Sequence, residues 1–219
     1  MIENRNLRLL FPSPLFYMYL TDSGIADRLE QTLIKMRADG IGKEFDSNGF
    51  FWQSNDNLYE MKEFYELNSV IYSEMNSILD TMQVVRDGFY INNMWANIAI
   101  PPHQHATHIH PNSYMSGLFY VRTPKSSANT LFEDPRGMGH HMLEPEYKQL
   151  NELNSSSELV AAEKNKLMFW PSWIPHGVQV QRIDDTFVQE EYDGMRMTVA
   201  FTIMLVGKNT LPTRKIIWK

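Results

Sequence analysis

The chain has 219 residues, a formal net charge of −6 and no cysteine. Without cysteine there is no disulfide framework and no thiolate metal site, which leaves histidine and carboxylate side chains as metal ligands. No run of lysine or arginine forms the basic stripe of a nucleic-acid-binding protein, and no apolar run approaches the roughly 20 residues that span a bilayer. We therefore expect one cytoplasmic domain, residues 1–219, with no nucleic-acid or membrane partner, and a homo-oligomer remains open.

The first 87 residues favour extended and helical structure. Residues 7–20 are apolar but contain Pro12 and Pro14, which predicts two short extended pieces, one of them at a sheet edge. Polar residues 21–23 offer N-cap acceptors, apolar residues then repeat at helical spacing, and Gly40 supplies a stop, so we predict a helix there. A second helical apolar face runs from about residue 57 to residue 82. We expect residues 1–87 to support a sheet.

From residue 88 onward the pattern is typical of strands separated by turn residues. Because helices come first and strands follow, the fold class expected is α+β, mainly β, with an antiparallel sheet or barrel as the core, residues 88–219. Residues 138–157 show no clear period and are expected to form a long surface excursion. The predicted strands are residues 89–100, 114–122, 130–134, 159–162, 166–170, 177–183 and 195–206.

Four of the seven histidines fall between residues 103 and 110. Imidazole is the commonest protein ligand of borderline transition metals, and two histidines separated by one residue point the same way only on extended backbone. Two pairs meet this condition, His103 with His105 and His108 with His110. The first pair has odd residue numbers and the second has even ones, and side chains alternate between the two faces of a strand. On one continuous strand the two pairs therefore face opposite sides, and only one pair lines a given cavity.

The flanking residues favour the second pair. A turn signal, Pro111 to Ser113, follows His110 and leads into the strand predicted from residue 114, so His108 and His110 are placed at the mouth of a hairpin. Two prolines precede His103, which predicts a loop leaving the preceding strand. The alternative is a solvated polar loop that merely contains histidines.

A metal site needs a third protein ligand from elsewhere in the fold. His176 lies between two predicted strands, directly after Pro175 and before Gly177. Taken alone it is an ordinary turn histidine. Together with a His-x-His pair on another hairpin, it is a candidate ligand that completes a set of three and leaves open positions for a substrate or cosubstrate.

Arg196 lies in a predicted strand where Met195, Met197 and Val199 alternate with polar or small residues, so the strand has one polar face. A guanidinium directed into a barrel needs an anionic partner. That partner is either an acidic side chain of residues 184–193 or a bound carboxylate ligand, with Thr198 on the same face adding a hydroxyl group. Tyr120 and Asn97 are further candidates for the same anion, or are ordinary core and strand residues.

These motifs together, His108-Ile-His110, SGLFYV, PHGV around His176, and Arg196-Met-Thr198, resemble the iron(II)- and 2-oxoglutarate-dependent oxygenases. The resemblance covers residues 95–206 and is strongest to an uncharacterised bacterial and phage branch with an HxHPxS...SGxxYV core. It implies a double-stranded β-helix, a jelly-roll barrel flanked by helices. It also implies an oxidoreductase that couples oxidative decarboxylation of 2-oxoglutarate to hydroxylation of a substrate, in a bacterium or a phage-infected host.

Carried across residue by residue, the resemblance implies His108 and His176 as Fe(II) ligands and Arg196 as the partner of the distal carboxylate of 2-oxoglutarate, assisted by Thr198 and Tyr120. This chain departs from the family at the second ligand position, where His110 replaces the usual aspartate or glutamate. Three neutral imidazoles leave the charge of the metal uncompensated, which favours an anionic cosubstrate but also suits other metals.

Two other functions fit the same residues. A three-histidine cupin-type metalloenzyme without a 2-oxo acid predicts that Arg196 is paired with an acidic side chain. A non-catalytic metal-binding barrel predicts a closed site with a fourth protein ligand, His103 or His105. The sequence does not indicate the primary substrate.

Overall fold

The computed structural model describes residues 7–21, 23–47, 49–100, 103–125, 127–136, 145–179, 194–208 and 217–218. In this part of the chain no helix is both long and apolar enough to cross a membrane.

The N-terminal segment forms an edge strand and two helices. Strand β1 (Phe16–Tyr19) follows the prolines and pairs with the edge of the large sheet, as predicted. Helix α1 (Ile25–Ala38) begins after Gly24, which has φ +66°, and the backbone N–H of Ile25 donates to the Ser23 hydroxyl at 3.2 Å. Two short 3₁₀ turns, η1 (Leu58–Glu60) and η2 (Lys62–Phe64), lead into α2 (Tyr65–Thr81), so the second predicted helix begins later than its apolar pattern.

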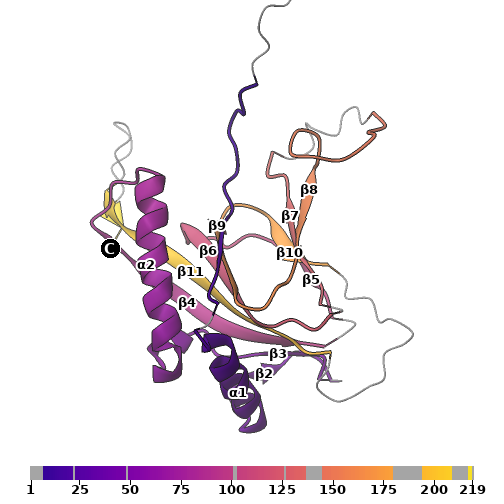
Figure 1. Ribbon diagram of the computed structural model, residues 1–219. Coiled ribbons are helices and arrows are strands. Elements are labelled where there is room, and N and C mark those ends of the chain that lie inside the picture. The colour runs from indigo at the N-terminus through magenta and orange to yellow at the C-terminus, as the bar shows by residue number, and fades with distance from the viewer. Residues whose placement is uncertain are drawn as a thin grey trace, which may run out of the picture.

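Two antiparallel sheets form a jelly roll (Figure 1). The large sheet has the order β1-β9-β6-β11-β4-β3-β2, and β12 pairs with β11. The small sheet has the order β5-β10-β7-β8. The remaining bounds of the large sheet are β2 (Lys43–Glu44), β3 (Phe51–Gln53), β4 (Gly88–Ala99), β6 (Met115–Arg122), β9 (Lys166–Pro171), β11 (Arg196–Lys208) and β12 (Ile217–Trp218). Those of the small sheet are β5 (His105–His108), β7 (Thr130–Glu133), β8 (Ser157–Val160) and β10 (His176–Val178).

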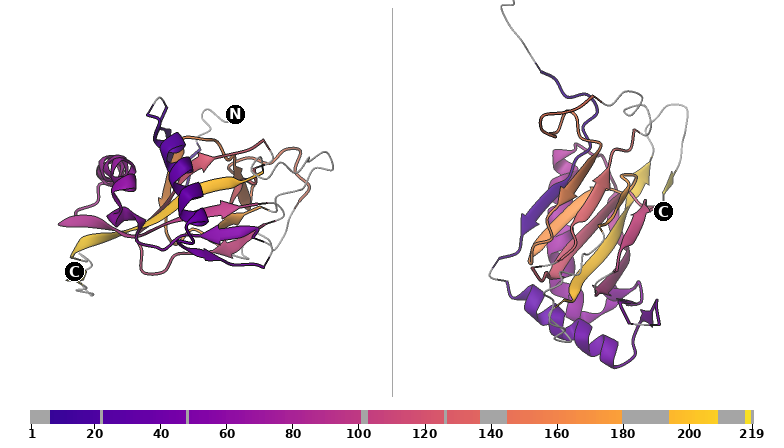
Figure 2. Two further views of the ribbon diagram at one scale, coloured as in Figure 1. Left: turned by 90° about the horizontal axis from the view of Figure 1, so that it is seen from below. Right: turned by 90° about the vertical axis from the view of Figure 1, so that its right-hand side faces the viewer.

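The two faces of the large sheet bury different side chains. One face packs against α1 and α2 in the main apolar core, to which β11 contributes Met197, Val199, Phe201 and Ile203. Both helices lie on this side of the large sheet, and the small sheet lies on the other side (Figures 1 and 2). The alternate residues of β11, Arg196, Thr198, Ala200 and Thr202, therefore face the small sheet. This confirms the predicted polar face of the strand and places it inside the barrel.

Close packing of the central strands depends on a small residue. A Cβ on Gly117 of β6 would lie 2.1 Å from the Phe201 ring and 2.7 Å from the backbone oxygen of Met168. Glycine at this position of the SGLFYV motif therefore leaves room for the Phe201 ring of β11 and for the backbone of β9, the two strands that pair with β6.

Three predictions need correction. Strands β2 and β3 were not predicted, because two- and three-residue strands are too short to show a period. His105, expected in a loop, begins the strand β5 (His105–His108). The strand predicted at residues 177–183 begins at His176 and ends at Val178, Gln179 is not part of it, and residues 180–183 lie outside the described residues. In the predicted excursion, residues 138–144 are outside the described residues, residues 145–153 are exposed, and β8 begins at Ser157.

Candidate metal and cosubstrate site

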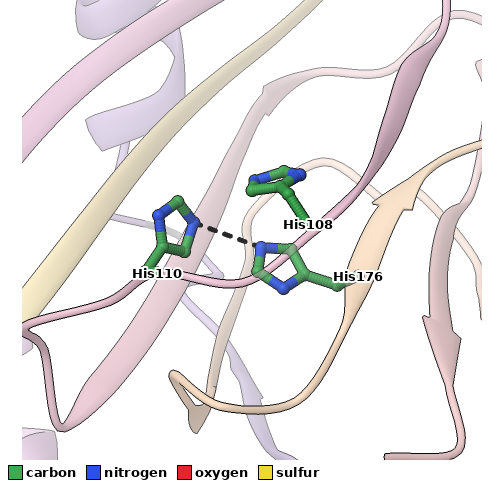
Figure 3. Close-up of side chains that lie close together, drawn as sticks. All are labelled: His108, His110 and His176. Atoms are coloured by element: carbon green, nitrogen blue, oxygen red, sulfur yellow. Dashed lines mark hydrogen bonds between the residues drawn. The ribbon is translucent and has the colours of Figure 1, made fainter. Parts of the chain in front are cut away.

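Three histidines, two from adjacent strands and one from the segment that follows β5, meet at one point (Figure 3). His108 ends β5, His176 begins β10, and the two residues are register partners in the small sheet. His110 follows two residues after His108, and its backbone N–H donates to the Ser172 carbonyl at 3.1 Å, which ties the end of this hairpin to the loop before His176. One nitrogen from each of the three imidazoles lies within 4.8 Å of the others.

The spacing of the imidazole nitrogens suits a metal ion. Nε2 of His110 and Nε2 of His176 are 3.2 Å apart. Two ligands at about 2.1 Å from a metal, placed at a right angle, are about 3.0 Å apart. The two Nε2 atoms are therefore already about as far apart as two neighbouring ligands of one metal ion. The His108 ring is 4.5 Å from that of His176 and 4.9 Å from that of His110, which closes a triangle.

Backbone carbonyls orient two of the three rings. Nδ1 of His108 is 2.8 Å from the Ala106 carbonyl oxygen, and Nδ1 of His176 is 3.0 Å from that of Ile174. When each Nδ1–H donates to its carbonyl, each Nε2 keeps a free lone pair for a metal. The Trp170 indole nitrogen is 3.3 Å from the same Nδ1 of His176. Its N–H can donate to Nδ1 only in the Nε2–H tautomer, in which Nδ1 carries no proton. We assign the Nδ1–H tautomer because the contact with Ile174 is shorter.

Two of the three imidazoles, those of His110 and His176, have lowered pKa values. Burial and, to a smaller extent, the neighbouring His108 together lower the pKa of His110 to about 4. Burial also lowers the pKa of His176 to about 3, although the hydrogen bond with Ile174 acts in the opposite direction. Neutral imidazole is the form that binds a metal, so no proton competes at these two positions at neutral pH.

His105 lies on the same side of β5 as His108, contrary to the parity argument from the sequence. His176 pairs with His108, and Val178 pairs with His105. The same length of sheet therefore takes three residue steps on β5 and two on β10, which is a β-bulge in β5. This bulge turns His105 toward the barrel interior, where its ring is 4.5 Å from His108 and 6.2 Å from Phe51 of the large sheet. The sequence contains no signal that marks a bulge at this position.

Gly177 makes room for the bulge. A Cβ there would lie 2.7 Å from the backbone oxygen of His105 and 3.1 Å from the backbone nitrogen of Thr107. The glycine that follows His176 thus lets β5 approach β10 closely where the two strands carry His108 and His176.

His103 and His105 do not belong to the ligand group. Among the described residues, only His108, His110 and His176 bring ligand nitrogens within 4.8 Å of one another. The ring of His103 is instead stacked on Phe51, with centroids 4.0 Å apart and an interplanar angle of 1°. The closed four-ligand site expected for a structural metal is therefore not formed by either histidine.

Arg196 lies at the start of β11 and is 3% exposed. Its guanidinium lies over the Tyr120 ring, 5.2 Å from the centroid. Within the described residues, Nε and Nη2 of Arg196 are buried and have no hydrogen-bond partner. These two nitrogens form one edge of the guanidinium, the fork that binds a carboxylate through two parallel hydrogen bonds. The acidic residues 184–193, expected as alternative partners, lie outside the described residues.

The other three predicted cosubstrate residues share one row across the large sheet. Thr198 pairs with Asn97 on β4 and with Tyr120 on β6. The Thr198 hydroxyl is buried without a partner among the described residues. The Tyr120 hydroxyl is 2.6 Å from the Thr130 hydroxyl of the small sheet, and the Asn97 side-chain oxygen accepts a hydrogen bond from Gln53 at 3.0 Å. Thr198 therefore has the free hydroxyl group, while Tyr120 and Asn97 are already engaged.

A second apolar cluster surrounds this polar site inside the barrel. Its members are Leu118, Tyr120, Phe132, Met168, Trp170, Ile174 and Ala200, with Trp95 packed against it. The Trp170 and Phe132 rings are 4.8 Å and 6.2 Å from that of His176, and Trp95 is 5.5 Å from His110. Apolar rings thus line the site beside His110 and His176.

The fold and the site together define a double-stranded β-helix protein in which three histidines are close enough to hold a metal ion and a buried guanidinium edge has no partner among the described residues. Comparison with sequence families gives the more specific class, since residues 93–201, about half of the chain, match the family described as "Putative 2OG-Fe(II) oxygenase". The chain belongs to the 2-oxoglutarate- and Fe(II)-dependent oxygenases and is an oxidoreductase that uses both cofactors. A comparison with curated protein sequences finds no match.

Solved structures share the fold at low sequence identity. The non-heme alpha ketoglutarate dependent epimerase SnoN from nogalamycin biosynthesis aligns with a TM-score of 0.61 and 10% identity, over 93% of this chain and 89% of that one. A Pseudomonas putida prolyl-4-hydroxylase aligns with a TM-score of 0.61 and 9% identity, over 89% and 94%. HygX from Streptomyces hygroscopicus, solved with nickel, 2-oxoglutarate and hygromycin B bound, aligns with a TM-score of 0.54 and 11% identity, over 88% and 83%. These likenesses confirm the predicted jelly-roll fold.

Proposed function

We propose that His108, His110 and His176 hold Fe(II) as an all-imidazole triad, and that Arg196 and Thr198 bind the distal carboxylate of 2-oxoglutarate in a substrate hydroxylase. Tyr120 and Asn97 help to shape that end of the site. The observation that carries the proposal is the buried, unpartnered edge of Arg196 inside a barrel that also holds three convergent imidazoles.

Burial energetics favour a bound carboxylate at Arg196. A guanidinium taken out of water without hydrogen bonds costs several kcal/mol, about as much as a broken buried ion pair. Nε and Nη2 have no partner among the described residues, so an anion that accepts from both recovers this loss. A dicarboxylate also offsets the metal charge, because the three imidazoles are neutral ligands and contribute no negative charge.

Different residues orient the metal ligands, hold the cosubstrate and exclude water. Bound Fe(II) and 2-oxoglutarate supply the oxidation, in which one oxygen atom of dioxygen enters succinate, formed with carbon dioxide, and the other enters a C–H bond of the substrate. The carbonyls of Ala106 and Ile174 fix the His108 and His176 rings through their Nδ1 protons. Arg196 and Thr198 fix the far end of the cosubstrate, and the apolar rings around His176 exclude water.

The direct test is cosubstrate turnover and binding on the same preparation. Iron-loaded protein with isotopically labelled 2-oxoglutarate should release labelled succinate, slowly without a primary substrate and faster with one. Nickel-loaded protein should bind 2-oxoglutarate in calorimetry without turnover. If the metal-loaded protein neither binds 2-oxoglutarate nor forms succinate, the assigned roles are wrong.

A further inference from the structure

The sequence favours His108 and His110 over His103, but the structure places His103 at the end of the row of residues that carries Arg196. Phe51, Ala99 and Arg196 occupy one row across β3, β4 and β11, since Ala99 pairs with both other residues. The His103 ring is stacked on Phe51 at the end of this row, and the small side chain of Ala99 separates Phe51 from Arg196.

The pKa values of His103 and His105 also indicate that Arg196 is near both imidazoles. Burial lowers the pKa of His103, and the charge of Arg196 lowers it further, while Asp46 raises it. Arg196 also contributes to the lowered pKa of His105, after burial and the neighbouring histidines. The Arg196 charge is therefore close enough to act on both imidazoles from the opposite sheet.

Four of the seven buried side-chain polar atoms that have no partner among the described residues belong to Arg196, Thr198 and His103. They are Nε and Nη2 of Arg196, the Thr198 hydroxyl and Nε2 of His103. A buried polar atom without a partner costs free energy, and such atoms are few in native proteins. A carboxylate has about four lone-pair positions on its two oxygens, which matches these four groups.

We propose that His103 is a further binding residue for the cosubstrate, and that its Nε2–H donates to the distal carboxylate beside Arg196 and Thr198. This inference rests on the proposed function, because it takes 2-oxoglutarate to be the anion at Arg196. A neutral imidazole in the Nε2–H form suffices, and the stack on Phe51 holds the ring in place. The pocket then prefers a 2-oxo acid with a second carboxylate over one without it.

The test compares two 2-oxo acids on nickel-loaded protein by calorimetry, so that no turnover is involved. 2-Oxoglutarate carries the distal carboxylate, and 2-oxobutyrate lacks it. The variant His103→Phe keeps an aromatic ring against Phe51 but removes the donor, and His103→Gln keeps a donor near the position of Nε2. We expect His103→Phe to weaken 2-oxoglutarate binding about tenfold to a hundredfold and to leave 2-oxobutyrate binding unchanged. We expect His103→Gln to bind 2-oxoglutarate nearly as tightly as the wild type.

The controls separate this inference from the proposed function. If the wild-type protein does not bind 2-oxoglutarate, the proposed function has failed before His103 is tested. If wild type binds it and His103→Phe binds it equally well, or loses both acids alike, His103 does not contact the distal carboxylate. Should the Phe variant not fold, a crystal structure of the wild-type nickel and 2-oxoglutarate complex decides the point. Nε2 must then lie within about 3.2 Å of a distal carboxylate oxygen.

Discussion

His105 and His108 are three residues apart on β5, yet both side chains face the barrel interior with ring centroids 4.5 Å apart. On a regular strand an odd spacing puts two side chains on opposite faces. The bulge at the register shift between β5 and β10 brings both side chains to the same face, and Gly177 leaves the space that the bulge needs. As a result a row of imidazoles lines the interior from the metal ligands toward Arg196.

The first prediction concerns Arg196. We expect Arg196→Met to weaken 2-oxoglutarate binding about a hundredfold, because the fork that accepts the distal carboxylate is lost, while metal affinity stays unchanged. Calorimetry on nickel-loaded protein measures both. Arg86→Met is the matched control, since Arg86 pairs with Asp80 far from the barrel interior. If Arg196→Met leaves both metal affinity and 2-oxoglutarate binding unchanged, Arg196 does not bind the distal carboxylate, and the cupin-type enzyme without a 2-oxo acid is favoured instead.

The second prediction concerns the missing carboxylate ligand. His110→Asp introduces a negative charge at the position where the family usually has one, so the metal keeps a net charge of about +1 instead of +2. We expect the variant to retain metal and to bind the 2-oxoglutarate dianion more weakly than wild type. His110→Ala should lose most of the metal affinity. If His110→Ala binds metal as well as wild type, His110 is not a ligand.

Metal binding should stabilise the folded protein. A metal that binds only the native state adds about 2.7 kcal/mol at a concentration one hundred times its Kd. We expect nickel to raise the midpoint of thermal unfolding and a chelator to reverse the rise. His176→Ala should abolish the response, while His103→Phe should keep it, because His103 lies outside the ligand group. Equal responses in both variants would contradict the assignment of His176.

The metal-free protein should lose stability on mild acidification. Burial holds the pKa of His110 at about 4 and that of His176 at about 3, below the value of about 6.5 for an unfolded histidine. Between pH 6.5 and pH 4 the unfolded state therefore binds more protons than the native state, so the free energy of unfolding falls as pH falls. Urea denaturation at pH 7 and pH 5 measures this. A double variant His110→Gln/His176→Gln should show a smaller fall, and an equal fall would assign it to other groups.

Gly177 should be intolerant of a side chain. Gly177→Ala places a methyl group 2.7 Å from the His105 backbone oxygen, and overpacking of this kind costs about 1–3 kcal/mol. We expect lower stability in urea denaturation together with weaker metal binding, because His108 and His176 sit at the same strand pair. Gly88→Ala is the control, since a Cβ there meets nothing within 4 Å. Normal metal binding in Gly177→Ala would show that the bulge does not position the ligands.

Local sequence patterns determined much of the architecture. Apolar spacing predicted α1 and α2, and alternation along residues 195–206 predicted the polar face of β11 that carries Arg196 and Thr198. These patterns are readable because the side-chain period of a helix or strand repeats along one segment. Residue type determined the rest of the prediction, since crowded histidines without cysteine limit the chemistry to imidazole and carboxylate ligands.

Tertiary structure alone decided which histidines share the cavity. The bulge in β5 is set by contact with Gly177 on another strand, so no period within residues 103–110 encodes it. The place of His103 likewise depends on Phe51, which is far away in sequence and lies in a strand too short to predict. Side-chain direction along one strand is a local property, whereas register and stacking between segments arise from packing in three dimensions.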